Sequence, residues 1–173
     1  MRDESKHPWV RGDLVVLRAV LEQVFDEARS AYARDEESCG FLVGPEGDAR
    51  ALDGIVPMKN RANALHALDP DAYPRTGRMY FDIDSMKFEK AIREGDTARR
   101  PVKVLYHSHL DVGAYFSATD AEVAKMGESE PPYDLAYLVT SVRKGEVDDH
   151  KLFVWEPSSL SFVESRLSIL GDS

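Results

Sequence analysis

Cysteine and long hydrophobic runs are the first things this sequence lacks. Among its 173 residues it has one cysteine, Cys39, which excludes an intrachain disulfide and gives no support to secretion. No apolar stretch reaches the roughly 18 residues that a membrane-spanning helix needs. No apolar segment of the signal-peptide type follows the charged residues 1–6. We therefore expect a cytoplasmic protein without a membrane partner.

Positive charge is also scarce. The chain has 22 Lys and Arg residues and 31 Asp and Glu residues, which gives a formal net charge of −9. Binding to nucleic acid or anionic lipid without sequence preference depends on a clustered basic surface. The one local cluster, Arg99, Arg100 and Lys103, is too small to provide it, so we expect no nucleic-acid partner. The length fits a single domain over residues 1–173, with a core of about 14–165.

Apolar periodicity predicts both helices and strands, without a regular alternation of the two. Spacings of three and four residues indicate helix, whereas short runs rich in β-branched residues indicate strand. We expect helices over residues 14–33, 84–95 and 117–126, and strands over residues 38–43, 49–58, 79–83, 102–106, 135–142, 151–155 and 161–164. This order predicts an α+β protein, in which helices pack on a mixed sheet.

Two segments, residues 59–79 and 127–134, have no clean period and contain several prolines. Long irregular loops in a small domain are often functional. We therefore interpret residues 59–79 as a long loop that can carry function, and residues 127–134 as a second irregular loop.

Two histidines follow the predicted central strand. Side chains alternate along a strand, so His107 and His109 point to one face and Ser108 to the other. Two imidazoles on one face are a natural start for a transition-metal site. A structural zinc site needs four protein ligands, which a chain without a C-x-x-C motif does not readily supply. A catalytic zinc site needs three ligands and keeps one position for water.

Asp120 is the candidate third ligand. If a helix begins at Ser117, then Ser117 and Asp120 share one face of its first turn. The loop of residues 110–115 is long enough to bring that turn back to the histidines. Taken alone, S-x-x-D is more often a capping box, and H-x-H more often a pair of sheet residues. The joint pattern favours a metal site.

The spacing of these residues resembles that of a known family. H-x-H, then seven residues, then S-x-x-D is the signature of the JAMM (MPN+) metalloprotease domain, and residues 107–120 match it. The family usually has proline after the second histidine and often before the serine. This chain has Leu110 and Phe116 at those two positions.

A second part of the resemblance lies after the first predicted helix. The family carries a glutamate there, followed at two and three residues by Cys or Met and then Gly; this chain has Glu37-Ser38-Cys39-Gly40. The resemblance covers residues 17–162. It implies the MPN (cytidine-deaminase-like) fold: a three-layer α/β/α arrangement with a curved, mixed, mainly antiparallel sheet. It also implies that residues 59–79 and 127–134 are the insertions that border the substrate groove.

The resemblance assigns a role to each site residue. His107, His109 and Asp120 would bind one Zn²⁺ ion per chain, with water as the fourth ligand. Glu37 would act as general base and acid, and Ser117 would donate a hydrogen bond to the oxyanion. Together these roles imply a zinc metallohydrolase of the peptidase or isopeptidase type.

The resemblance also indicates a class of substrate. Most characterised relatives cleave the bond after the Gly-Gly tail of ubiquitin or a ubiquitin-like protein, and small single-domain relatives act on sulfur-carrier proteins. We therefore expect a partner with a Gly-Gly tail. A zinc amidase for short peptides or small amides, and a non-catalytic MPN scaffold, remain alternatives. A nucleobase deaminase needs H-x-E with P-C-x-x-C, which one cysteine cannot satisfy.

Four further residues have weaker interpretations. Glu36 is a possible alternative to Glu37, although strand alternation places the two on opposite faces. Cys39 fits a packed side chain better than a nucleophile. Asp111 is near enough to orient a ligand from a second layer. His66 lies in an irregular loop, where a solvent-exposed histidine is the simpler interpretation.

Overall fold

The central feature of the fold is a six-stranded sheet in the order β4-β2-β5-β6-β7-β8. The computed structural model describes residue 4 and residues 6–171, so part of the N-terminal segment considered above lies outside the described residues. The six strands are β2 (Cys39–Val43), β4 (Gly54–Met58), β5 (Val102–Leu110), β6 (Ala136–Arg143), β7 (Glu146–Glu156) and β8 (Ser161–Ser165). Only β5 and β6 run parallel; the other neighbouring pairs are antiparallel. The predicted mixed, mainly antiparallel sheet is therefore confirmed.

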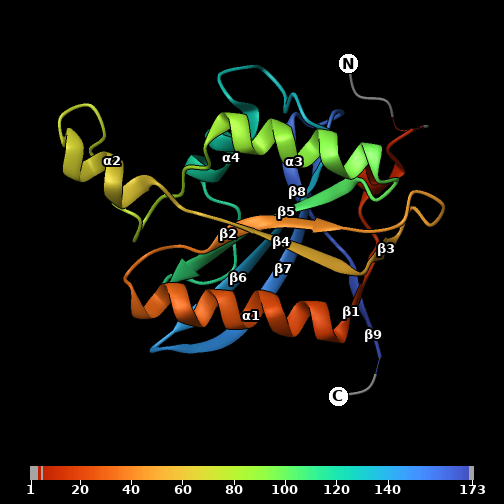
Figure 1. The fold of residues 1–173 in the computed structure, drawn as a ribbon, viewed down its shortest axis with the longest axis horizontal. Coiled ribbons are helices and arrows are strands. Elements are labelled where there is room, and N and C mark those ends of the chain that lie inside the picture. Colours follow the sequence, from red (N-terminus) through yellow and green to blue (C-terminus); the bar gives the residue numbers. More distant parts are fainter. Residues whose placement is uncertain (1–3, 5, 172–173) are drawn as a thin grey trace.

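Helices cover both faces of this sheet (Figure 1). Helix α1 (Arg18–Ala33) lies on one face, and α3 (Ser85–Thr97) and α4 (Ala118–Lys125) lie on the other. The short helix α2 (Ala62–Leu68) projects away from the sheet. None of the helices in the described part of the chain combines the length and apolarity needed to cross a membrane. The result is the expected α+β arrangement of three layers.

Each face of the sheet has its own hydrophobic core because strand side chains alternate. Under α1, residues such as Val24, Tyr106 and Leu138 are buried together. On the opposite face, Phe88 of α3 packs with Leu105 and other apolar residues of the sheet. The strands β5 and β6 contribute to both cores, which fixes their register.

A second, smaller sheet corrects the prediction for the start of the chain. The predicted helix over residues 14–33 begins only at Arg18, because residues 14–17 form strand β1 (Leu14–Leu17). This strand pairs in parallel with β3 (Ala51–Leu52) and β9 (Leu167–Leu170). A short 3-10 helix, Pro8–Arg11, precedes it. The run Leu-Val-Val-Leu suits a strand, and its partners are remote in the sequence.

Four other predictions are wrong in detail. The segment 59–79 is not entirely irregular, since it contains α2. Residues 79–83 form no strand. Gly95 does not end α3, which continues to Thr97; a side chain at Gly95 would come within 2.8 Å of the carbonyl oxygen of Arg100, so the glycine permits a close backbone approach. Strand β5 is also longer than predicted, so both histidines lie within it.

Candidate metal centre

Strand β5 places two histidine side chains side by side on the α3 face of the sheet. His107 and His109 are 1% and 3% exposed, and their Nε2 atoms lie 3.2 Å apart. Pairing with β2 and β6 on both sides holds this part of the strand extended. Ser108 points the other way, where its Oγ accepts a hydrogen bond from the Ser38 N–H at 2.8 Å. The expected alternation is thus present at the candidate ligands.

The first turn of α4 brings a carboxylate to these histidines. Asp120 Oδ1 lies 3.1 Å from His107 Nε2, and Oδ2 lies 3.1 Å from His109 Nε2. Ser117 caps the helix: its Oγ accepts from the Asp120 N–H at 3.0 Å, and its own N–H donates to Asp120 Oδ2 at 2.9 Å. The capping box and the approach to the histidines therefore coexist, because one carboxylate serves both.

Neighbouring groups orient the two imidazole rings. His109 Nδ1 lies 2.9 Å from the carbonyl oxygen of Gly113, which can only accept, so Nδ1 carries a hydrogen and Nε2 is the ring nitrogen turned toward Asp120. Gly113 has φ +93°, a conformation that favours glycine. The His107 ring stacks on Phe81, with centroids 4.8 Å apart. Both Nε2 atoms consequently face Asp120.

The three side chains fit a divalent transition-metal ion. Their candidate ligand atoms all lie within 4.8 Å of one another, and all three residues are buried. Burial raises the pKa of Asp120, but the charge of His107 and the hydrogen bonds of both histidines outweigh it and hold that pKa well below its usual range. The carboxylate is thus kept in the ionised form that binds metals. Two imidazoles and one carboxylate are a ligand set suited to zinc in an open, catalytic site.

Glu37 supplies a second buried carboxyl group next to this cluster. It lies two residues before β2 and is 4% exposed; its Oε1 has no hydrogen-bond partner among the described residues. Since Cys39 pairs with His107, Glu37 lies toward the His109 end of β5. Burial raises the pKa of Glu37 well above its ordinary value, and the negative charge of Asp120 raises it further. Such a group can hold and release a proton closer to neutral pH.

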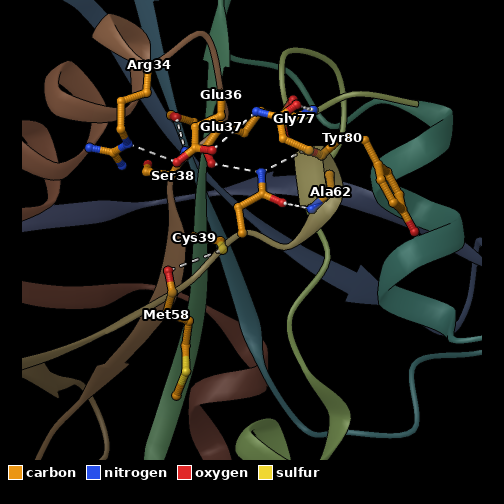
Figure 2. A network of polar contacts seen from close by, with 12 residues as sticks. Arg34, Glu36, Glu37, Ser38, Cys39, Met58, Ala62, Gly77 and Tyr80 are labelled. Carbon is orange, nitrogen blue, oxygen red and sulfur yellow. Dashed lines mark hydrogen bonds and ion pairs between the residues drawn. The ribbon is translucent and has the colours of Figure 1, made fainter. Parts of the chain in front are cut away.

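The backbone around Glu37 is fixed by contacts that the sequence did not indicate (Figure 2). Its N–H donates to the Gly77 carbonyl at 2.6 Å, and its carbonyl accepts from Asn60 Nδ2 at 3.0 Å. Asn60 Nδ2 also donates to the Tyr80 carbonyl at 3.0 Å. Asn60 is 6% exposed and joins the backbone of Glu37 to that of Tyr80. Nothing in the sequence distinguishes this residue from an ordinary turn asparagine.

The alternative glutamate and the cysteine have different surroundings. Glu36 forms an ion pair with Arg34, with Oε1 and Nε 3.0 Å apart, and accepts a hydrogen bond from Asn63. It is therefore not the buried carboxyl group of the cluster. Cys39 is 2% exposed and its Sγ lies 3.7 Å from the Met58 carbonyl (Figure 2). Burial raises the pKa of this thiol, so it remains protonated and packs as a small apolar side chain.

Asp111 and His66 lie outside the cluster. Asp111 has φ +61° and accepts hydrogen bonds from Tyr32 Oη at 3.0 Å, Arg78 Nη2 at 3.2 Å and the Lys144 N–H at 2.9 Å. Asp111 lies directly after β5, and these bonds join it to three other parts of the chain. The observed contacts of Asp111 are therefore structural. His66 Nδ1 lies 2.8 Å from the Tyr73 carbonyl, a local contact of the α2 segment.

The two positions where the family usually has proline are filled by well-packed residues. Leu110 is 4% exposed at the end of β5. Phe116 packs against Phe162 and Tyr137, with ring centroids 4.4 Å and 5.4 Å apart. Aromatic packing thus holds the loop before Ser117 in place, where proline would restrict the backbone directly.

A cavity of about 470 Å³ opens beside the cluster. His107 and Asp120 form part of its wall. The two irregular segments also contribute, through Arg75 from the first and Tyr133 from the second. The rest of the lining is mostly apolar and comes from residues 80–83, from α3 and α4 with their flanking residues, and from the sheet.

Comparison with known proteins places this geometry in context. The family described as prokaryotic homologs of the JAB domain matches residues 17–155. Proteins of Mycobacterium bovis and Mycobacterium tuberculosis, both named CysO-cysteine peptidase, are 33% identical over 135 residues, which is 75% of this chain and 75% of theirs.

Two solved structures share the fold. A protein from Desulfitobacterium hafniense superposes with a TM-score of 0.63 at 20% identity, covering 92% of this chain and 94% of its own. A JAB1/MPN domain protein from Archaeoglobus fulgidus superposes with a TM-score of 0.52 at 12% identity, covering 91% and 99%. At these identities the likeness concerns the fold alone.

Proposed function

This chain belongs to the family of prokaryotic JAB-domain homologs, and from that premise we propose that it is a zinc-dependent peptidase. Its substrate would be a ubiquitin-like or sulfur-carrier protein, cleaved at the amide bond after a C-terminal Gly-Gly tail. The observation that carries the proposal is the convergence of three buried side chains that can bind a metal beside a buried carboxyl group, Glu37, whose Oε1 has no hydrogen-bond partner among the described residues. The mycobacterial relatives named CysO-cysteine peptidase support both the reaction and the type of substrate.

His107, His109 and Asp120 would hold the zinc ion, His109 through the Nε2 atom that its bond to Gly113 leaves free. When bound in such a site, zinc lowers the pKa of its water from 15.7 to about 7 and polarises a carbonyl group. The Ser117 N–H donates to Asp120 Oδ2 and so orients this carboxylate for the task.

Glu37 would move the proton. Its Oε1 is buried and has no hydrogen-bond partner in the described residues, so it is available to take a proton from the attacking water. The raised pKa of Glu37 lets it keep that proton and then pass it to the leaving amine. Breakdown of the amide needs this second transfer, because an unprotonated amine leaves poorly.

Ser117 would stabilise the developing oxyanion. Its Oγ already accepts a hydrogen bond from the Asp120 N–H, which orients the hydroxyl and leaves its hydrogen to donate. Its place at the N-terminus of α4 also favours negative charge. Donors of this kind, placed before the reaction, contribute strongly to catalysis.

An extended Gly-Gly tail can be held by adding a strand to a sheet edge. Strand β4 forms one edge of the six-stranded sheet, next to β2 and so on the side where Glu37 lies. We therefore place the tail along this edge, with its last carbonyl group at the metal centre.

The test combines metal analysis with hydrolysis. We expect the purified protein to hold about one zinc ion per chain, to cleave a Gly-Gly-tailed carrier fusion, to lose activity with a chelator and to recover it with zinc. Faster turnover of the free tail peptide than of the fusion would favour the amidase alternative. Zinc-loaded protein that cleaves neither would favour the scaffold.

A further inference from the structure

The cavity beside the metal centre has more space than the glycines of a Gly-Gly tail would fill. Its volume of about 470 Å³ is roughly three times the ~150 Å³ of a cavity that admits benzene. Two metal-binding residues, His107 and Asp120, lie in its wall, so whatever fills it lies next to the scissile bond. The cavity is thus positioned to bind part of the substrate.

The lining defines which chemistry the cavity accepts. Apolar and aromatic side chains dominate the wall, among them Phe88, Leu105, Phe116 and Leu135. Its charged residues are four acidic side chains, Asp120 among them, and one arginine, Arg75, which is 3.8 Å from Glu122. An acidic group would therefore be repelled more than attracted, whereas a large apolar group would be desolvated favourably.

The position of this group in the substrate follows from the proposed function, on which this inference rests. Glycines before the scissile bond have no side chain that could enter a cavity. Of the residues directly beside the scissile bond, only the one on the leaving side has such a side chain. We propose that the cavity is the specificity pocket for that residue, and that it selects a large apolar side chain, above all an aromatic one. A residue as small as cysteine or alanine would leave most of the space unfilled.

The test compares peptides that differ only in the leaving residue. Acetyl-Gly-Gly-Gly-X-amide is used with X as Phe, Leu, Cys, Ala or Asp. For the zinc-loaded protein we expect kcat/KM to be at least about tenfold higher for Phe than for Ala, since apolar pockets discriminate by about 10- to 200-fold per methylene. Asp should be the poorest substrate. Binding of the same peptides to the Glu37→Gln protein, measured by calorimetry, should follow the same order.

Two substitutions on α4 fill the cavity without replacing a metal-binding residue. Ala124→Leu adds bulk at a buried lining position, and Val123→Phe does so at a half-buried position that tolerates change more easily. Each should reduce the Phe-to-Ala ratio to near one, mainly by lowering the rate for Phe. The control, Ala98→Leu, lies at an exposed site outside the lining and should keep the wild-type ratio. Zinc content and thermal melting establish that each variant is folded.

The outcomes separate this inference from the proposed function. Equal kcat/KM for Phe and Ala in an active enzyme overturns the specificity pocket and leaves the peptidase intact. If no peptide or carrier fusion is cleaved, the proposed function fails, and calorimetry alone decides the preference of the cavity. Equal affinity of the protein for the Phe and Ala peptides then overturns the specificity pocket as well.

Discussion

The two faces of β5 differ although both are buried. On the α1 side, Val104 and Tyr106 are 0% exposed and belong to a packed core. On the α3 side, His107 and His109 are almost as buried, but His107 borders a cavity. Burial alone therefore does not separate core from site. The difference lies in the open space beside groups that can bind a ligand. A shift of one residue in the pairing register of β5 would exchange the two faces.

The sharpest test of this comparison removes one side chain from each face. His109→Ala should lose bound zinc and nearly all hydrolysis, because it deletes a ligand. Leu138→Ala, which pairs with Tyr106 on the α1 side, should retain zinc but lose about 2–5 kcal/mol of unfolding free energy. Metal analysis and denaturant unfolding measure the two effects. Full zinc occupancy in His109→Ala would mean that the ligands are wrongly assigned.

Two adjacent glutamates give a smaller but cleaner contrast. Glu37→Gln should keep zinc while kcat falls about 10²–10⁴-fold, as expected on loss of a general base. Glu36→Gln should have nearly normal activity, because its ion pair with Arg34 is partly exposed and such pairs contribute about 0–1 kcal/mol. Steady-state kinetics with metal analysis checks both variants. A Glu37→Gln protein with a normal rate rules out this assignment.

Two helix caps separate catalysis from local stability. Ser117→Ala should raise the barrier by about 2.7–4 kcal/mol and also remove a cap worth about 1 kcal/mol. Asp84, whose side chain caps α3 by accepting from the Met86 and Lys87 N–H groups, provides the control. Asp84→Ala should lose a similar stability with little change in kcat. Thermal melts and kinetics on both proteins make the comparison; equal losses of activity would assign Ser117 a structural role only.

The smallest predicted effect is a pH dependence of the metal-free protein. The pKa of Glu37 is raised in the folded state, so between its ordinary value near 4.5 and the raised value the folded chain binds more protons than the unfolded chain. The unfolding free energy should therefore fall as pH rises through that window, by at most about 1.4 kcal/mol per unit. Glu37→Gln should lack this component. Denaturant titrations from about pH 5 to 8 on both proteins, with chelator present, measure the difference. If the unfolding free energies of the two proteins changed with pH in the same way, the raised pKa assigned to Glu37 would be contradicted.

Local patterns made much of this arrangement predictable. His109 is two positions after His107 on a strand, so the two side chains point to the same face. Asp120 is three positions after Ser117 on a helical turn, so these two also share a face. The family resemblance adds Glu37 and the overall fold. The H-x-H and S-x-x-D patterns lie in short segments, whose geometry the local sequence determines nearly alone.

The remaining features depend on contacts between distant segments. Residues 14–17 form a strand because they pair with residues 167–170 and 51–52, which no local period reveals. Residues 79–83 have no strand to pair with in the described chain, and Phe81 instead stacks on His107. The cavity arises only where α3, α4 and the sheet leave a space, so it could not be predicted from the sequence.

If Asp120 binds zinc as proposed, its reciprocal bonds with Ser117 make retention of the ion depend on the first turn of a short helix. Helix α4 has eight residues, and isolated helices below about 12–15 residues are marginal in water. Unwinding of its first turn would withdraw one ligand while both histidines stay in the sheet. The lifetime of the bound ion would then be set by local fraying, and hydrogen exchange at the Asp120 amide should keep pace with zinc release into a chelator.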